Sequence, residues 1–263
     1  MRLRTIATSL LLAFLCLAGT VQAAPVAQVI NLSGPLFALS GDGTRRVLSI
    51  GSPIEPGETL ITEGNTYAQI RFIDQGVVTL RPASQFKIEA FEFDANAPEK
   101  DSAAFGLLKG ALRTVTGLIG KRGNQDAYRM NTVTATIGIR GTSFSATLCP
   151  GPGCGELPAG TYVSVFDGAI AVGAPPPVPG VPLPPIPTPP IVLSAGQFGF
   201  APPDGPPQQL PGDPGAGRDF SPPPTFNSSE ESSRQTPAGE QPPPQGATRY
   251  DSQQAQPEGC VVR

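Results

Sequence analysis

The chain contains no histidine and no tryptophan among its 263 residues. Histidine most often serves as a general base, a zinc ligand or a pH switch, so its absence excludes histidine-dependent triads and histidine-containing zinc sites. Charged residues are also sparse, at 15% of the chain, with 21 acidic against 18 basic side chains. A broad basic surface for nucleic acid is therefore not expected, and no nucleic-acid partner is predicted.

Proline and glycine are abundant, with 33 and 31 residues. Together they make nearly a quarter of the chain unsuited to regular structure. The remaining apolar residues are sufficient for one core if they are concentrated in one part of the chain. We therefore expect a single folded domain that is much shorter than the full sequence.

Residues 1–24 are predicted to be a secretory signal peptide. Arg2 and Arg4 precede an apolar run from Ile6 to Ala18, and small residues follow at the expected cleavage site. The alternative, an uncleaved membrane anchor, is disfavoured because the run is too short for a comfortable span. Cleavage would remove Cys16 and leave a mature chain with a net charge of about −5. We expect this mature chain to have no transmembrane span and to lie in the periplasm or outside the cell.

The rest of the chain reads as short strands separated by turns. Between Tyr67 and Ile73 apolar and polar residues alternate, which is the period of a half-buried strand. Phe86 and Ile88 share one face of a later strand, but the phenylalanines that follow fall on the opposite face. A β-bulge near Ala90, which adds one residue to the strand, would bring all of them to the same face. Strands at intervals of roughly 8 to 12 residues, without a convincing long helix, predict an all-β domain: a short β-helix, a roll or a sandwich.

The centre of this domain is predicted to be Thr132–Leu148, read as two strands joined by a glycine corner. Gly138 and Gly141 bracket the corner and hold Arg140, and Phe144 starts the buried face of the second strand. A further hairpin is predicted within Thr161–Val172 through Asp167 and Gly168, followed by a last strand over Ile191–Phe200.

A glycine-rich segment over residues 116–123 superficially resembles a phosphate-binding loop. The Walker pattern requires a glycine where Val115 stands and a serine or threonine where Arg122 stands. We interpret the segment instead as a turn that carries two solvated cations, Lys121 and Arg122.

Several motifs occur in an order that resembles the FecR domain family of bacterial envelope proteins. They are Pro-Gly-Glu-x-Leu-x-Thr (56–62), Phe-x-Asp running into Val-x-Leu-x-Pro (72–82), Leu-x-x-Gly (107–110), Ile-Arg-Gly-Thr-x-Phe (139–144), Val-Phe-Asp-Gly-Ala-Ile-Ala-Val (165–172) and Leu-Ser-Ala-Gly-Gln (193–197). The similarity covers residues 28–200. Glu58 stands where the family usually has aspartate, and Gln75 separates an Asp-Gly pair that is commonly adjacent.

This resemblance implies an all-β periplasmic domain. In the best-understood members it also implies a cytoplasmic segment that regulates a sigma factor, joined through one membrane span to a periplasmic sensor. Because only five residues precede the apolar run, the anti-sigma role is not carried over to this chain.

The residues expected to matter structurally in this signature are Gly138, Arg140, Gly141, Thr142, Phe144 and Gly196. Gly138 and Gly141 are expected to adopt positive φ or to allow close backbone approach. Arg140 has two interpretations: it caps carbonyls or pairs with an acid such as Asp167, or it contacts an anionic partner.

Cys149 and Cys154 enclose four residues, and in an exported protein a disulfide is the natural interpretation. The alternative, a metal or redox pair, is disfavoured because the spacing is not Cys-x-x-Cys and histidine is absent. No metal or cofactor is predicted. Cys260 is then left without a partner.

Three domain segments are expected. The signal peptide at 1–24 precedes a FecR-like β-domain at 25–201, which has a proline-rich insertion at 174–190, and a disordered tail occupies 202–263. In the insertion ten of seventeen residues are proline, which predicts an extended spacer or a ligand for an aromatic groove.

The composition and the resemblance favour a non-enzymatic binding or sensing module of the bacterial envelope. Its partner would be an envelope protein or a cell-wall component. The alternatives are a structural scaffold or tether, and a regulator of transmembrane signalling. An enzyme is not predicted, because the available acids (Glu58, Asp74, Glu89 and Asp167) occupy turns or polar strand faces where solvated carboxylates are routine.

Overall fold

The computed structural model describes residues 24–122, 124, 126–151, 154, 156–175 and 189–216. Residues 1–23 of the predicted signal peptide, most of the proline-rich insertion, Cys260 and the tail beyond residue 216 lie outside this part of the chain. Within it the protein is nearly all β, with fifteen strands and a 3-10 turn, η1 (Pro98–Lys100). The prediction of an all-β fold is confirmed.

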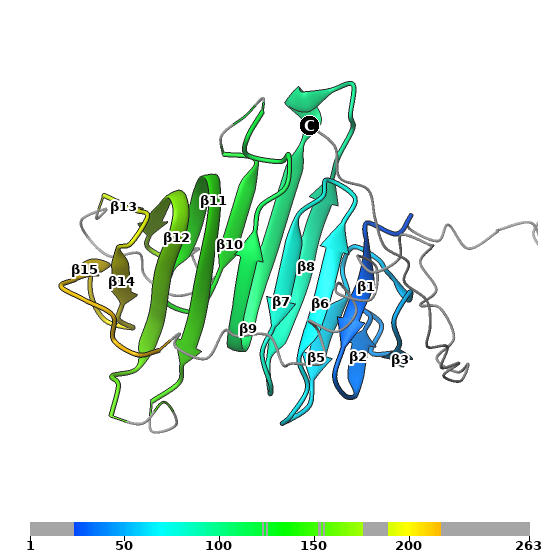
Figure 1. Cartoon of the computed structure of the whole chain (residues 1–263), viewed down its shortest axis with the longest axis horizontal. Coiled ribbons are helices and arrows are strands. Elements are labelled where there is room, and N and C mark those ends of the chain that lie inside the picture. Colours follow the sequence, from blue (N-terminus) through cyan, green and yellow to red (C-terminus); the bar gives the residue numbers. More distant parts are fainter. Residues whose placement is uncertain are drawn as a thin grey trace, which may run out of the picture.

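The strands follow one another along the longest axis of the molecule in roughly their sequence order (Figure 1). They are β1 (Ala27–Leu32), β2 (Leu36–Leu39), β3 (Arg45–Leu48), β4 (Pro53–Ile54), β5 (Thr59–Thr62), β6 (Ala68–Phe72), β7 (Val77–Leu80), β8 (Gln85–Glu92), β9 (Ser102–Val115), β10 (Tyr128–Asn131), β11 (Thr136–Cys149), β12 (Gly160–Gly173), β13 (Ile191–Ser194), β14 (Phe198–Ala201) and β15 (Gln208–Leu210).

All of these strands belong to one branched sheet. The first branch runs β4-β1-β6-β7 and continues through β9, β11 and β12 to β14 and β15. The second branch runs β3-β2-β5-β8 and continues through β9, β10, β11 and β12 to β13. The two branches therefore share three long strands.

Each of the three long strands passes from one branch to the other at a glycine. The first part of β9 pairs with β8 up to Lys109, whereas the part after Gly110 pairs with β7. In β11 and β12 the partners change in the same way near Gly141 and Gly168. All three glycines have positive φ, of 79°, 61° and 71°, which bends a strand at little steric cost.

Apolar side chains of both branches meet in one core. In β6 the burial alternates as the sequence predicts, with Ala68, Ile70 and Phe72 inside. The Phe72 ring lies 5.2 Å from the ring of Phe105, which belongs to the second branch. The branches thus pack face to face, as in a sandwich whose layers are joined by the bent strands.

One predicted irregularity of the sheet is confirmed. The β8–β9 ladder shifts register between Ile88 and Ala90, at the predicted bulge. Gln75, which separates the Asp-Gly pair common in the family, has a positive φ of 70° in the turn that joins β6 to β7.

Three predictions about the later strands are wrong. The stretch Thr132–Leu148 is a turn followed by the single strand β11, not two strands around a corner. Likewise, Thr161–Val172 lies within the continuous strand β12, not in a hairpin. The last predicted strand, Ile191–Phe200, is divided into β13 and β14 by a turn at Gly196, which has a φ of 79°. In addition, β15 pairs with β14 within the segment predicted to be disordered.

Candidate functional site

The family motifs converge on one place, which we call the signature junction. It comprises the turn between β6 and β7, the segment that follows β9, and the bends of β11 and β12. Its central residues are Asp74, Thr116, Gly117, Gly141, Thr142 and Gly168.

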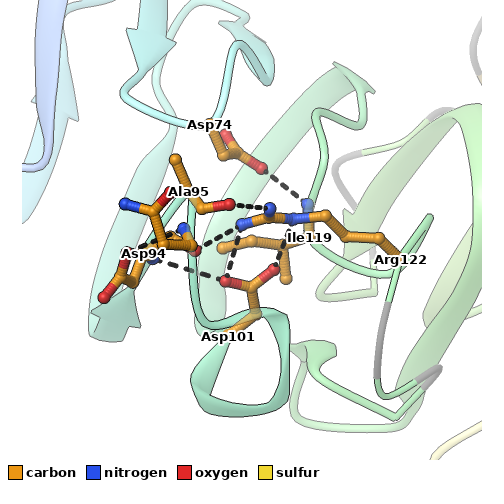
Figure 2. A network of polar contacts seen from close by, with 7 residues as sticks. Asp74, Asp94, Ala95, Asp101, Ile119 and Arg122 are labelled. Atoms are coloured by element: carbon orange, nitrogen blue, oxygen red, sulfur yellow. Dashed lines mark hydrogen bonds and ion pairs between the residues drawn. The ribbon is translucent and has the colours of Figure 1, made fainter.

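Asp74 fastens the turn between β6 and β7 to the segment after β9. Its carboxylate accepts hydrogen bonds from the Gly76 N–H at 2.9 Å and from the Ile119 N–H at 3.2 Å, the second of which is drawn in Figure 2. Its backbone carbonyl accepts a third, from the Leu118 N–H at 3.0 Å. The side chain is buried, and this burial raises the pKa of Asp74, whereas the two N–H donors lower it.

Thr116 and Thr142 join the segment after β9 to the signature in β11. The Thr142 N–H donates to Thr116 Oγ1 at 2.9 Å, while the N–H and the hydroxyl of Thr116 both donate to the Thr142 carbonyl at 3.0 Å. Both residues are buried. The signature threonine, Thr142, therefore contributes its backbone N–H and carbonyl groups. Thr116 provides the hydrogen-bond partners of both groups, which regular strand pairing does not pair at this bend.

Glycine is required at three positions of the junction because other atoms lie against them or because the backbone is left-handed. A side chain on Gly168 would collide with the Gly141 carbonyl, and one on Gly117 would collide with the backbone of Asp74 and Gly76. Gly141 itself has positive φ, as predicted. Gly138 has no positive φ, and a Cβ atom added to it would meet nothing within 4 Å, so its predicted special role is wrong.

Arg122, which is partly buried, forms a latch beside the junction with the buried side chain of Asp101 (Figure 2). Its Nε and Nη2 atoms donate to the two Asp101 carboxylate oxygens at 3.1 and 3.2 Å, and it also donates to the carbonyls of Asp94 and Ala95 at 2.7 and 2.8 Å. Its guanidinium lies 4.7 Å from the centre of the Phe93 ring. The prediction of a solvated cation is wrong for Arg122, which ties the loop between β8 and β9 to the segment after β9.

Lys121 and Arg140 line an open hollow of about 340 Å³ on the surface of the junction, with Gly120 and Gly141. Both side chains are exposed, and the aliphatic part of Lys121 lies against Gly141. In β11, Arg140 pairs with Ala169 of β12. An anion could contact either cation here, so both interpretations of Arg140 remain predictions.

The outer face of the first branch carries an apolar and basic patch next to the junction. Arg71, Val77 and Val115 are direct neighbours across β6, β7 and β9, so their side chains share this face. Val115 is 48% exposed. Arg113 lies on the same face two residues before Val115, and its guanidinium is 4.3 Å from the centre of the Phe166 ring, which is 45% exposed. We call Arg71, Val77, Arg113, Val115 and Phe166 the outer patch.

The remaining predicted residues lie away from the surface of the junction. Phe144 is completely buried in the core. Cys149 and Cys154 form the predicted disulfide, with their Cα atoms 5.7 Å apart. It packs beside the stacked rings of Tyr162 and Phe200, in a small cluster separate from the main core.

The acids considered for catalysis are not all solvated, which corrects the expectation from the sequence. Glu58 and Asp74 are both only 4% exposed. The Glu58 carboxylate accepts hydrogen bonds from Arg46 Nε and Nη2 at 2.9 and 2.8 Å and from the Glu55 N–H at 2.9 Å. It therefore stabilises a turn, as Asp74 does. Sequence patterns missed these roles, although Asp74, two residues before a glycine, has the spacing of an Asx turn.

No group of three or more potential metal ligands occurs among the described residues. Among the same residues, no helix is long and apolar enough to cross a membrane.

Comparison with solved structures finds four similar chains, three of which are described here. One, described as a cell surface anchoring domain, is 32% identical over 24% of this chain and 83% of its own length, with a TM-score of 0.23. Two are structures of a proposed anti-sigma factor from Parabacteroides distasonis ATCC 8503, with identities of 15% and 13% and TM-scores of 0.41 and 0.39. Each of these two matches covers 59% of this chain and 60% of the other, so the chain spans less than two thirds of their length.

No curated protein sequence matches the chain significantly. The comparison with protein families does give a match, to the family described as FecR protein, over residues 58–171. This range begins at the buried Glu58, contains the Asp74 turn and the Arg122 latch, and ends within β12 after the bend at Gly168. The matched segment thus holds every part of the signature junction, and this chain carries a domain of the FecR family.

Proposed function

We propose that this protein is a non-enzymatic binding module of the bacterial envelope, and that it binds a protein partner through the outer patch. The observation that carries the proposal is the placement of exposed apolar side chains, Val115 and Phe166, beside the signature junction. The disulfide supports an oxidising compartment, in agreement with an exported protein.

The outer patch has the chemistry of a protein interface. Aromatic residues and arginine are enriched in interfaces, and the patch offers Phe166 with Arg113 stacked on it and Arg71 nearby. The two arginines favour a partner segment that presents carboxylates around an apolar side chain. Asp167 lies at one margin and would disfavour an acidic group at that point.

The signature junction supports this role by keeping the patch rigid. Val115 directly precedes Thr116, which is hydrogen-bonded to Thr142, and Phe166 lies two residues before the close-packed Gly168. A surface that is already ordered loses less conformational entropy on binding. The signature residues then act as positioning residues, while the contacts belong to the outer patch.

The proposal is tested by crosslinking in intact cells with the full chain and two matched variants. V115D places a carboxylate in the outer patch, whereas V192D places one on β13, in the second branch, where Val192 is 60% exposed. We expect V115D to lose the crosslinked protein and V192D to retain it, with equal thermal midpoints for both variants. If V115D retains its partner, the outer patch is not the binding surface.

The same experiment separates binding from a structural tether. A variant that ends at residue 216 keeps every described strand and the outer patch. A binding module retains its partner after this truncation. A tether loses it, and does so whether or not Val115 is changed.

A further inference from the structure

A small cavity lies in the core directly beneath the signature junction. Its volume is about 10 Å³, and aromatic and aliphatic side chains of both branches form most of its wall, including Phe72, Phe91 and Phe105. Polar groups also line it: Asp74 and Thr114 from the first branch and Tyr128 from the second. A space of roughly 10–15 Å³ with two to four polar partners is what one buried water requires.

The Tyr128 hydroxyl is the group that points to an occupant. The residue is 6% exposed, and its Oη atom has no hydrogen-bond partner among the described residues. Buried hydroxyl groups in proteins are paired in the large majority of cases, because desolvation without a partner is unfavourable. Tyr128 lines the cavity, which offers a place for the small hydrogen-bonding partner that its hydroxyl group lacks.

Two further polar side chains, Thr114 and Asp74, line the same cavity as the Tyr128 phenol. Burial raises the pKa of this phenol, a polar contact with the Thr114 side chain lowers it, and the Asp74 carboxylate raises it further. The contact with Thr114 does not meet the distance and angle of a hydrogen bond, so the Oη atom stays without a partner among the described residues. Each Asp74 oxygen accepts one backbone N–H and retains the capacity to accept a second donor.

We propose that the cavity is a binding site for one water molecule, which accepts a hydrogen bond from the Tyr128 hydroxyl group and donates hydrogen bonds to the oxygens of Asp74 and Thr114. The water joins the two branches of the sheet, because Tyr128 lies in β10 and the other two groups belong to the first branch. It also supports the Asp74 side chain that fastens the signature junction. This inference is independent of the partner proposed above.

The test compares the full chain with Y128F, which removes the hydroxyl and keeps the ring. If the water is bound, Y128F loses a satisfied hydrogen bond, and we expect the thermal midpoint to fall by about 2–4 °C. If the cavity is dry, Y128F removes an unpaired buried hydroxyl, and the midpoint rises. Y162F provides the scale, because the Tyr162 hydroxyl donates directly to the Pro158 carbonyl at 2.9 Å.

A direct observation stands beside the stability test and needs no variant. In a high-resolution crystal structure of the unmodified chain we expect a density peak within hydrogen-bond distance of Tyr128 Oη, Asp74 and Thr114. Thr114→Val should weaken or abolish this peak without changing the ring of Tyr128. An empty cavity in the unmodified protein, or a Y128F variant more stable than it, overturns the proposal.

Discussion

Gly168 and Gly138 lie on adjacent strands and have opposite surroundings. At Gly168 the φ of 71° disfavours any side chain, and a Cβ atom would collide with the Gly141 carbonyl. We expect G168A to lower the free energy of unfolding by about 2–4 kcal/mol, from backbone strain and overpacking together. In the matched control, G138A meets nothing within 4 Å and should change it by no more than about 0.5 kcal/mol. Urea unfolding of both variants measures the difference, and equal effects would show that the junction is not close-packed.

Arg122 and Arg45 form ion pairs that differ in burial. The Asp101 side chain opposite Arg122 is fully buried, whereas Arg45 and Glu63 are 51% and 53% exposed. Removing Arg122 leaves an uncompensated buried carboxylate, so R122A should lower the free energy of unfolding by about 3–5 kcal/mol. R45A should cost at most about 1 kcal/mol. Chemical denaturation distinguishes the two, and a small effect of R122A would show that the pair with Asp101 does not stabilise the fold.

The sequence did not reveal the roles of Asp74 and Arg122, because the local pattern around each residue does not indicate burial. Each residue stands in a segment rich in glycine and polar residues, which is typical of solvated turns. Their burial depends on segments distant in sequence: Ile119 is 45 residues from Asp74, and Asp101 is 21 residues from Arg122. Gly141 has the predicted positive φ, whereas Gly138, a glycine in the same strand pattern, does not, so the local pattern alone did not distinguish the two.

At the scale of elements, alternation was sufficient to predict strands, but it did not distinguish a bend from a reversal. Arg140-Gly141 and Asp167-Gly168 both read as turns, yet β11 and β12 continue through them. A strand with a bulge and two strands with a tight turn have nearly the same local pattern. The outcome is decided by pairing across the sheet, where both strands change partners at these glycines.

The disulfide lies where β11 leads into its connection to β12, and it packs against the small cluster of Tyr162 and Phe200. Because its loop is short, loop-closure entropy assigns it about 2 kcal/mol. We expect the double variant C149S and C154S to lose about this much stability and to become insensitive to dithiothreitol. The unmodified protein should fall to the same stability when it is reduced. If reduction has no effect, the cross-link does not stabilise the fold.

At the scale of the whole molecule, the two branches enclose one core, so the ionisation of a buried group affects the stability of the entire fold. Asp74 is such a group, because burial raises its pKa in the folded state above the ordinary value of 3.8. Below pH 3.8 the carboxyl is protonated in both states and its contribution to stability is fully present. As the pH rises through the folded-state pKa, the unfolded chain has already released its proton, and that contribution is lost.

We therefore expect the stability of the unmodified protein relative to D74N to decrease from about pH 4 upward and to level off above the folded-state pKa of Asp74. D42N is the matched control, because Asp42 is exposed and hydrogen bonds from the backbone and hydroxyl of Thr44 lower its pKa. The stability of the unmodified protein relative to D42N should decrease in the opposite direction, as the pH falls below 3.8. Urea unfolding of the three proteins between pH 3 and pH 8 measures both differences. A D74N difference that grows with rising pH would mean that the N–H donors of Gly76 and Ile119 outweigh burial, and that Asp74 stabilises the junction as a carboxylate.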